Sequence, residues 1–308
     1  LGIYPPRGGS SYQTGELGIL TDYDYKGDGW KIRRVLDNGP GSFEKSRLFA
    51  GDVITAIGDK PVSANISVYA HLYDKVGDRI RLTVTDKDGK ERTVIIQPVS
   101  TREVNNLLYD DWVVRNRKLV DEYSAGRLGY VHIRSMDQGS YDQFQQEVYA
   151  EGKGKEGLVI DVRNNGGGWT TDILLRIIGQ KQHAFTIPRG GGKGYPDMER
   201  KQVFLWTKPM VVTCNEGSYS NAEIFSHAVK TLGLAKLVGM PTFGAVISTG
   251  GTGLIDGSYF RIPFRGWYVA GTGKNMENGP AIPDYIVEPE PEDEANGIDR
   301  QLKKAVQV

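Results

Sequence analysis

The chain has 308 residues with 38 basic and 38 acidic side chains, so its formal net charge is zero. This length allows two ordinary domains, each with its own core. The neutral balance excludes a global field that would favour nucleic acid or an anionic membrane surface. No stretch approaches the roughly 20 apolar residues of a membrane span. We therefore expect a soluble protein of the cytoplasm or the periplasm, with neither nucleic acid nor membrane as its partner.

Residues 1–14 are predicted to be the remnant of a preceding segment. The chain begins with Leu1 rather than methionine, and "LGIY" has the pattern of the middle of a strand. We expect part of the natural protein to lie upstream. The single cysteine, Cys214, excludes an internal disulfide framework and a cysteine-based metal site, and the apolar run "PMVVTC" predicts that its thiol is buried.

Residues 15–100 read as short strands separated by glycine turns, with alternating apolar positions typical of half-buried strands. The segments "GELGIL" and "GPGSFEKSRLFAGDVITAIGDKPV", followed by a helix that carries His71, resemble a PDZ domain. The resemblance implies that an extended peptide adds as a strand beside "LGIL" and faces the helix. The alternative is a scaffold whose groove is unused. The predicted peptide-binding residues are Leu17, Gly18, Ile19, Leu20 and His71.

The charged residues 101–125 are predicted to be a linker that ends in a helix or strand. From Gly126 to residue 308 strands such as "GLVIDVR" and "PMVVTCN" alternate with helical stretches, which indicates an α/β layered domain. Asp299 is predicted to cap a terminal helix. The glycine-rich "PRGGGKGYP" is predicted to be a mobile loop, since no helix follows it to bind a phosphate. The other predicted helices lie near residues 141–150, 171–180 and 221–232.

Ser220 in "NEGSYSNAEIF" has two interpretations. It stands three residues before Glu223 and ahead of an apolar run, which is the pattern of a helix capping box. As a nucleophile it would need an oxyanion site, a base and a group that orients the base. "GLVIDVRNNGGGW" could supply the first, because a strand, a glycine turn and a helix follow one another and leave free backbone N–H groups.

Together these two segments resemble the catalytic core shared by the C-terminal-processing and tricorn serine proteases, from Gly126 to about Glu288. The resemblance implies that Ser220 is the nucleophile. It also implies that the backbone N–H groups of Gly168 and Asn221 line the oxyanion hole. Ser218 lies two residues too early for the pattern and is interpreted as part of the loop.

The base separates the two branches of this resemblance. The processing branch has a lysine after the glycine of a "TFGK"-like segment, but here "PTFGAV" places Ala245 there. The tricorn branch uses a histidine supported by a serine and a distant glutamate, whose place is matched by Glu277 in "MENGPAIPD". The alternative for Glu277 is an exposed loop carboxylate.

No histidine of this chain fits the base. His71 belongs to the PDZ-like helix, His132 to the strand "GYVHIR", and His183 to no motif. His227 lies seven residues past Ser220, about 10 Å along a helix and too far for a hydrogen bond. In the tricorn-type proteases the histidine follows a serine just upstream of the PDZ domain, so we expect the base to lie upstream of Leu1.

The sequence thus predicts a PDZ-like β domain followed by an α/β protease core that cleaves peptides or unfolded polypeptides by acyl transfer, without a metal or other cofactor. A homo-oligomer is possible. One alternative is a catalytically inactive peptide-binding protein. Another is a serine–lysine protease that uses Lys230 or Lys236. The family's preference for a basic side chain before the cut is not carried over, because "QHAFTIPRGGGKGYP" offers no acidic residue that matches.

Overall fold

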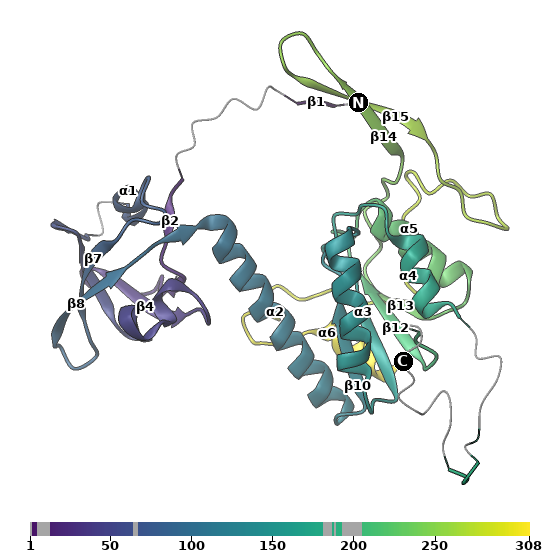
Figure 1. The fold of residues 1–308 in the computed structure, drawn as a ribbon, viewed down its shortest axis with the longest axis horizontal. Helices are drawn as coiled ribbons and strands as arrows, with labels where there is room; N and C mark the ends of the chain where they lie inside the picture. Colours follow the sequence, from purple (N-terminus) through teal and green to yellow (C-terminus); the bar gives the residue numbers. More distant parts are fainter. Residues whose placement is uncertain (1, 5–12, 64–66, 181–186, 188, 193–204) are drawn as a thin grey trace. The chain divides into compact units, whose positions relative to one another are not determined.

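The computed structural model describes residues 2–4, 13–63, 67–180, 187, 189–192 and 205–308. The chain forms two compact units, one of Gly8–Arg115 and one of Leu1–Arg7 with Asn116–Val308; they are called here the PDZ unit and the core unit (Figure 1). His183 and most of the predicted loop "PRGGGKGYP" lie outside the described residues. Among the described residues, no helix is both long enough and apolar enough to cross a membrane.

The PDZ unit is built on a six-stranded antiparallel sheet with the order β3-β4-β5-β7-β8, in which β6 pairs with β5. Buried and exposed side chains alternate along β7, which shows which face of the sheet is turned inward. Leu82 and Val84 are fully buried, while their neighbours are half-buried or exposed. A separate short pair joins β2 to β9. The bounds of these strands are β2 Gly15–Glu16, β3 Ile19–Thr21, β4 Trp30–Val35, β5 Val53–Ile57, β6 Lys60–Pro61, β7 Ile80–Thr85, β8 Glu91–Ile96 and β9 Val99–Ser100.

The predicted peptide groove corresponds to one edge of this sheet. Strand β3 pairs with β4 on one side only and ends the strand order, so its other edge carries unpaired backbone groups among the described residues. Gly18 has a φ of +68°, and a Cβ there would lie 2.7 Å from the ring of Pro40. The predicted helix with His71 is present as α1, Val68–Leu72. Two 3-10 turns, η1 at Pro40–Ser42 and η2 at Glu44–Ser46, form the segment after the glycine-proline turn.

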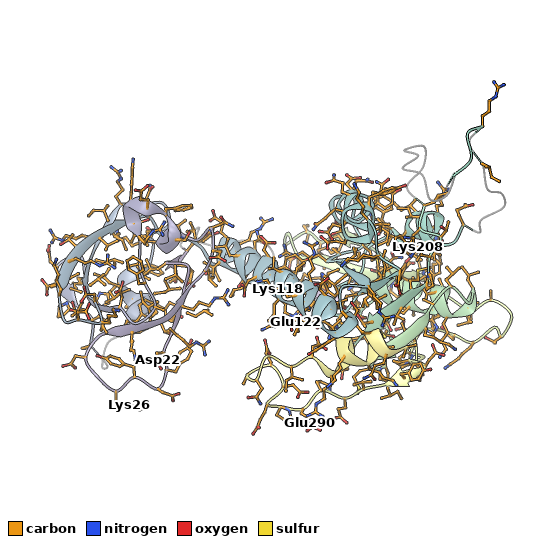
Figure 2. The ribbon with its side chains drawn as sticks, turned by 90° about the horizontal axis from the view of Figure 1, so that it is seen from below. Asp22, Lys26, Lys118, Glu122, Lys208 and Glu290 are labelled. Atoms are coloured by element: carbon orange, nitrogen blue, oxygen red, sulfur yellow. The ribbon has the colours of Figure 1, made fainter. Side chains whose placement is uncertain are left out.

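The segment predicted as a linker is a single helix, α2, from Thr101 to Ser124. From Val113 onward its buried positions recur every three or four residues, which places them on one face. Lys118 and Glu122, one turn apart, are exposed on the helix (Figure 2). The buried positions on that face are Val113, Asn116, Val120 and Ser124.

The core unit contains a five-stranded parallel sheet with the order β10-β11-β12-β13-β16. The interior strand β11 is buried along its whole length, as expected for a parallel sheet covered on both faces. The strands are β10 Leu128–His132, β11 Gly157–Asp161, β12 Met210–Cys214, β13 Lys236–Gly239 and β16 Tyr285–Ile286.

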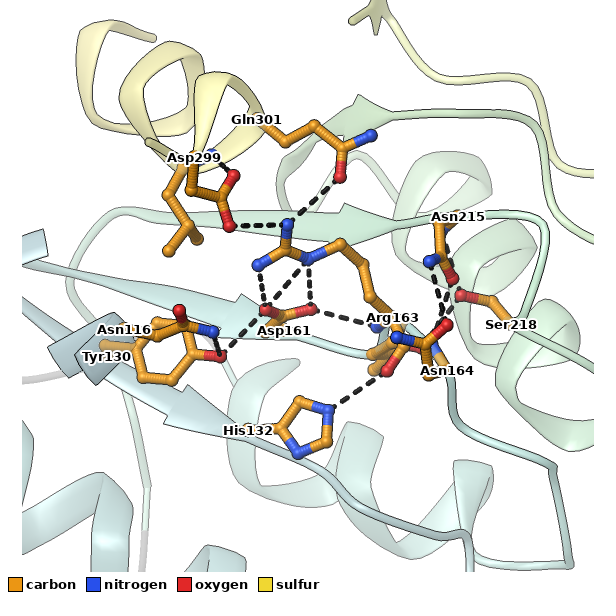
Figure 3. Close-up of polar contacts among 12 residues, drawn as sticks. Asn116, Tyr130, His132, Asp161, Arg163, Asn164, Asn215, Ser218, Asp299 and Gln301 are labelled. Carbon is orange, nitrogen blue, oxygen red and sulfur yellow. Dashed lines mark hydrogen bonds and ion pairs between the residues drawn. The ribbon is translucent and has the colours of Figure 1, made fainter. Parts of the chain in front are cut away.

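The two faces of this sheet differ in chemistry. Leu158, Ile160 and Val162 point into a large apolar cluster that includes side chains of helices α3, α4 and α5. The intervening Asp161 and Arg163 point to the opposite face, where they meet helix α6 (Figure 3). The helices are α3 Gln138–Gly152, α4 Thr171–Ile178, α5 Asn221–Thr231 and α6 Arg300–Gln307, the last capped by Asp299 as predicted.

A second sheet of the core unit consists of the hairpin β14, Ser248–Gly253, and β15, Tyr259–Arg265, with β1, Gly2–Tyr4, on its other side. Figure 1 shows this hairpin projecting from the layered part of the unit. Its side chains are largely exposed, and Ile255 at the tip is fully so. The hairpin directly follows residues 242–247, a segment that is bonded to Glu223 near Ser220.

Candidate active site

Ser220 stands at the N-terminus of α5 in a strained backbone conformation, with φ +57° and ψ −117°. A serine with positive φ in this region costs about 1–3 kcal/mol, and such strain gathers at functional sites. The capping box predicted with Glu223 is present: Glu223 Oε1 accepts a hydrogen bond from the Ser220 backbone N–H at 3.1 Å. A serine that only caps a helix has ordinary extended dihedrals, so the cap by itself does not explain this geometry.

The glycine turn after β11 packs directly on Ser220. A Cβ on Gly167 would lie 2.7 Å from Ser220 Cβ and 2.7 Å from the Tyr219 carbonyl oxygen. A Cβ on Gly168 would lie 2.0 Å from the carbonyl oxygen of Met136, and both glycines have positive φ. Only glycine fits at these two positions. The structure thus brings the two sequence segments together at one point.

Two backbone donors border this point. Among the described residues, neither the N–H of Gly168 nor that of Asn221 is paired with a backbone acceptor. Asn221 is the first residue of α5, where the helix presents its orphan donors and the positive end of its dipole. The side chain of Asn221 accepts a hydrogen bond from the Thr171 N–H at 2.9 Å. That bond ties the N-termini of α4 and α5 to each other.

Glu223 is fully buried and organises the segment that passes the serine. Besides Ser220, its carboxylate accepts hydrogen bonds from the hydroxyl of Thr242 at 2.8 Å, from the N–H of Ala245 at 2.9 Å and from the N–H of Gly244. Four donors on one carboxylate satisfy both of its oxygens, which a buried charge requires. One side chain therefore fixes both the nucleophile candidate and the turn that carries Ala245.

Glu277 is half-buried rather than exposed. Its Oε2 accepts hydrogen bonds from the N–H groups of Val246 at 2.8 Å and Ile247 at 3.0 Å. The two glutamates therefore hold consecutive stretches of the same strand-like segment. The sequence did not suggest these contacts of Glu277 with Val246 and Ile247.

Ser218 is fixed within the loop. Its side chain is fully buried, donates to the carbonyl of Val162 at 2.8 Å and accepts from the N–H of Asn215 at 3.1 Å. Asn215 in turn exchanges hydrogen bonds with Asn164. These contacts give Ser218 the role of joining the two loops at the carboxyl ends of β11 and β12.

The described histidines of the core unit are engaged elsewhere. His227 Nε2 lies 3.0 Å from the carbonyl of Gly279, and His132 Nε2 lies 3.0 Å from the carbonyl of Arg163. Burial lowers the pKa of both imidazoles below the ordinary value of 6.5.

A buried charged network lies beneath the glycine turn (Figure 3). Arg163, two residues after the end of β11, pairs with Asp161 at 2.7 Å and with Asp299 at 2.8 Å, and also donates to Gln301. Burial by itself would raise the pKa of Asp161, but the Arg163 charge and its hydrogen bonds outweigh that effect, so the pKa is lowered. The Tyr130 hydroxyl donates to the same carboxylate at 2.8 Å.

The structure brings Ser220, Gly168 and Asn221 of the sequence prediction to one place, and their predicted roles stay predictions. The sequence showed the capping box of Glu223 but not its further contacts. It also gave no function to Arg163, whose partners lie 136 and 138 positions further along the chain. The buried thiol of Cys214 is as expected, with its pKa raised by burial. A buried carboxylate with four donors is not visible in a local pattern, because three of those donors come from a distant loop.

A strained serine at a helix N-terminus, packed under a glycine turn in an α/β core that follows a PDZ-type domain, defines the class of the PDZ-bearing serine peptidases. Residues 127–287 match the model of peptidase family S41. Residues 15–101 match the tricorn protease PDZ domain. The chain belongs to peptidase family S41, and the resemblance to the tricorn-type proteases is confirmed.

Individual relatives agree with this assignment. Tricorn protease homolog 1 of Streptomyces coelicolor is 32% identical over 98% of this chain and 28% of its own length. The tricorn protease of Thermoplasma acidophilum is 30% identical over 94% of this chain and 27% of its own length. The crystal structure of the tricorn protease superposes with a TM-score of 0.80 at 28% identity, over 96% of this chain and 29% of that one. The chain thus spans little more than a quarter of these proteins.

Proposed function

We propose that Ser220 is the nucleophile of a serine peptidase and that the N–H groups of Gly168 and Asn221 bind the oxyanion. The observation that carries the proposal is the strained backbone of Ser220 against Gly167, beside two N–H groups without a backbone partner. A helix cap explains neither the positive φ nor the glycine packed against it. Family S41 membership supports the same reaction.

In this mechanism a base takes the proton of the Ser220 hydroxyl while its oxygen bonds to the peptide carbonyl carbon. The carbonyl oxygen becomes an oxyanion held by the two N–H groups. The C–N bond then breaks, the leaving amine takes the proton from the base, and water hydrolyses the ester on Ser220. Preorganised donors of this kind are each worth about 10²–10³ in kcat.

We assign the base to a histidine upstream of Leu1. His132 and His227 are bonded to backbone carbonyls elsewhere, and the resemblance to the tricorn-type proteases matches neither His71 nor His183 to the base. Glu277, whose Oε2 is held by two backbone N–H groups, would support that base through a carboxylate of fixed orientation. The chain covers only 27–28% of the length of these two relatives. We therefore propose the peptidase activity for the longer protein.

The serine–lysine alternative receives no support. Lys230 lies at the other end of α5, about 15 Å from Ser220 along the helix axis, and donates to the carbonyl of Ile282 at 2.6 Å. Lys236 begins strand β13 and is exposed. Ala245, where the processing branch has its lysine, follows directly after Gly244 beside Glu223.

Peptide binding by the PDZ unit is a second candidate function. The open edge of β3, with Ile19 and Leu20, could accept an extended segment through backbone hydrogen bonds. In a peptidase this edge would hold a substrate; in an inactive relative it would be the whole function. Leu17 contributes from the core of the unit, since its side chain is buried.

A fluorophosphonate probe, located by mass spectrometry, tests the proposal on this chain and on a version extended upstream. Labelling of Ser220 in the longer chain is expected, and Ser220→Ala should abolish it. Ser218→Ala should leave the label on Ser220. If neither chain is labelled although both are folded, the peptide-binding function replaces the peptidase.

The glycine turn provides a sharper test with a matched control. Gly167→Ala places a methyl group 2.7 Å from Ser220 Cβ, so labelling should slow by about 100-fold, the effect of a misplacement of roughly 1 Å. Gly166→Ala places its methyl group in open space and should label at the original rate. Equal rates for the two variants would contradict the contribution of the turn.

A further inference from the structure

The peptide group between Gly167 and Gly168 carries one of the two proposed oxyanion donors. Gly168 forms an isolated parallel bridge with Met136. The Met136 N–H donates to the Gly167 carbonyl at 3.0 Å, and the Met136 carbonyl accepts from the N–H of Trp169 at 2.7 Å. Both bonds use the neighbours of Gly168. Because the C=O and N–H of a trans peptide point in opposite directions, the Gly168 N–H points away from Met136.

The two glycines do not fix this direction by themselves. Turning the peptide over changes ψ of Gly167 and φ of Gly168, and glycine tolerates both signs of φ. Gly167 has a φ of +89° and Gly168 a φ of +148°. The close approach of Ser220 and Met136 leaves no room for a Cβ at either position. The groups that hold the peptide in one orientation must therefore come from neighbouring residues.

Ser135 supplies one of these groups. Its hydroxyl, on a half-buried side chain, donates to the Gly167 carbonyl at 3.2 Å, and the N–H of Met136 donates to the same oxygen. A carbonyl oxygen has two lone pairs and can accept both bonds. A peptide turned over would leave both donors without this acceptor. The Ser135 hydroxyl thus favours the orientation in which the Gly168 N–H is free to bind an anion.

Asn165 holds the preceding part of the turn with both ends of its amide. Its side chain is fully buried. Oδ1 accepts from the Gly167 N–H at 2.9 Å, and Nδ2 donates to the carbonyl of Ile133 at 2.7 Å. The backbone carbonyl of Asn165 accepts from the N–H of Tyr219 at 2.9 Å, directly before Ser220. One residue therefore connects the glycine turn to the segment that carries the candidate nucleophile.

We propose that Asn165 and Ser135 are positioning residues that hold the Gly167–Gly168 peptide with its N–H directed to the oxyanion. Neither side chain touches the substrate in this role, since both act through the turn. The inference rests on the proposed function and adds to it the groups that align one of its donors. The oxyanion exists in the tetrahedral intermediate and not in the bound peptide, so a loss of alignment lowers kcat and leaves KM nearly unchanged.

The first test is the steady-state kinetics of the full-length protein with a fluorogenic peptide. Asn165→Ala removes both amide bonds, and we expect kcat to fall about 100-fold, the effect of a displacement of roughly 1 Å. Ser135→Ala removes one of two donors to the Gly167 carbonyl and should lower kcat about 10-fold. In both variants KM should stay close to that of the unmodified protein. A loss confined to KM, or no loss in either variant, would overturn the inference.

Control variants separate alignment from stability. Asn116 is also buried in the core unit, and its amide donates to the Tyr130 hydroxyl at 3.1 Å. Asn116→Ala should therefore lower stability but keep kcat. Ser135→Thr keeps a hydroxyl, and Asn165→Ser keeps an acceptor for the Gly167 N–H, as in turns closed by serine. Both should recover part of kcat relative to the alanine variants. Equal losses of kcat in the Asn116 and Asn165 alanine variants would contradict a positioning role.

A peptide trifluoromethyl ketone reports on the oxyanion directly, because its reversible adduct on Ser220 carries one. Its Ki should rise about 100-fold in Asn165→Ala, in parallel with the fall in kcat. The Kd of the matching peptide amide, measured by fluorescence anisotropy on Ser220→Ala, should not change when Asn165→Ala is added. Equal changes in Ki and Kd would show that the side chain affects peptide binding instead, against the inference.

A crystal structure of the Ser135→Ala/Asn165→Ala double variant reads the orientation of the peptide without any catalysis. We expect the Gly167–Gly168 peptide to be displaced or turned over. If the unmodified full-length protein neither cleaves peptides nor labels at Ser220, and the peptide still moves in the double variant, the proposed function fails while the positioning holds. An unchanged peptide in the double variant overturns the positioning, whatever the activity of the protein.

Discussion

The largest buried cluster of the PDZ unit is apolar, whereas the core unit buries charged and amide groups beneath its candidate site. In the PDZ unit residues such as Ile32, Ile54 and Leu82 form that cluster, and its buried polar side chains are Thr21 and Asp52 among the described residues. The core unit adds fully buried Asp161 and Glu223. In the PDZ unit, apolar packing is sufficient to support the open edge of β3. In the core unit, the strained Ser220 is held by buried polar groups whose hydrogen bonds are made within the protein.

Removing the arginine of the buried network should have the largest effect. Arg163→Met leaves Asp161 buried without its charged partner, so we expect the free energy of unfolding to fall by about 3–5 kcal/mol. Hydrogen exchange read by mass spectrometry reports the core unit separately from the PDZ unit. Arg127→Met removes an exposed pair with Glu156 in the same unit and should change stability by less than about 1 kcal/mol. Similar losses in both variants would break the comparison.

The stability of the PDZ unit should depend most on its apolar packing, so a cavity in that cluster should lower it. Leu82 is fully buried in its apolar cluster, so Leu82→Ala should cost about 2–5 kcal/mol. Arg81, its neighbour in β7, forms an exposed ion pair with Asp59, and Arg81→Ala should cost less than about 1 kcal/mol. Hydrogen exchange in β7 and β8 measures both. A costly Arg81→Ala would show that charge matters in this unit as well.

Glu223 and Glu277 allow the contribution of buried hydrogen bonds to the stability of the core unit to be measured separately. Glu223→Gln keeps the shape but turns an amide NH₂ toward donors, because both carboxylate oxygens of Glu223 accept hydrogen bonds. We expect a loss of about 1–3 kcal/mol in urea denaturation. Glu277 uses Oε2 alone for its two backbone donors, so Glu277→Gln can present its amide oxygen there and should be nearly neutral for stability. A reversed order would contradict the assigned contacts.

The smallest effect concerns pH. Burial lowers the pKa of His132 and His227 in the folded state, so between the folded and the unfolded pKa the unfolded chain binds more protons. The stability of the core unit should therefore be constant above about pH 6.5 and fall as pH decreases below it, by at most about 1.4 kcal/mol per unit for each histidine. Urea midpoints at pH 7.5, 6.5 and 5.5 check this. His132→Gln should flatten the dependence; an unchanged slope would contradict the role of that ring.

The sequence was sufficient for the architecture because periodicity and turns are local. The strands of the α/β domain, the helix starts at Thr171 and Asn221, and the Asp299 cap all follow from patterns within a few residues. The helicity of the whole segment Thr101–Ser124 was missed because its charge suggested a linker. The resemblance to a family, rather than physics alone, gave Ser220 a role beyond a cap.

What the sequence could not provide are contacts between distant residues. The positive φ of Ser220 depends on Gly167 packing against it from another loop. The bonds from Glu223 to Thr242 and Ala245 join segments that no local pattern relates. These long-range polar contacts decide the chemistry of the site.

The link between Arg163 and helix α6 has a consequence for the order of events on the ribosome. Synthesis proceeds at about 5–20 residues per second, and the earlier parts of a chain fold first. Asp299 follows Arg163 by 136 positions, so the guanidinium is made on the order of ten seconds before its second carboxylate. Strand β11 and the glycine turn after it therefore reach their final environment only once helix α6 has emerged. Until then Arg163 has only the first of its two carboxylate partners, Asp161, so the charges buried in the core unit are incompletely paired.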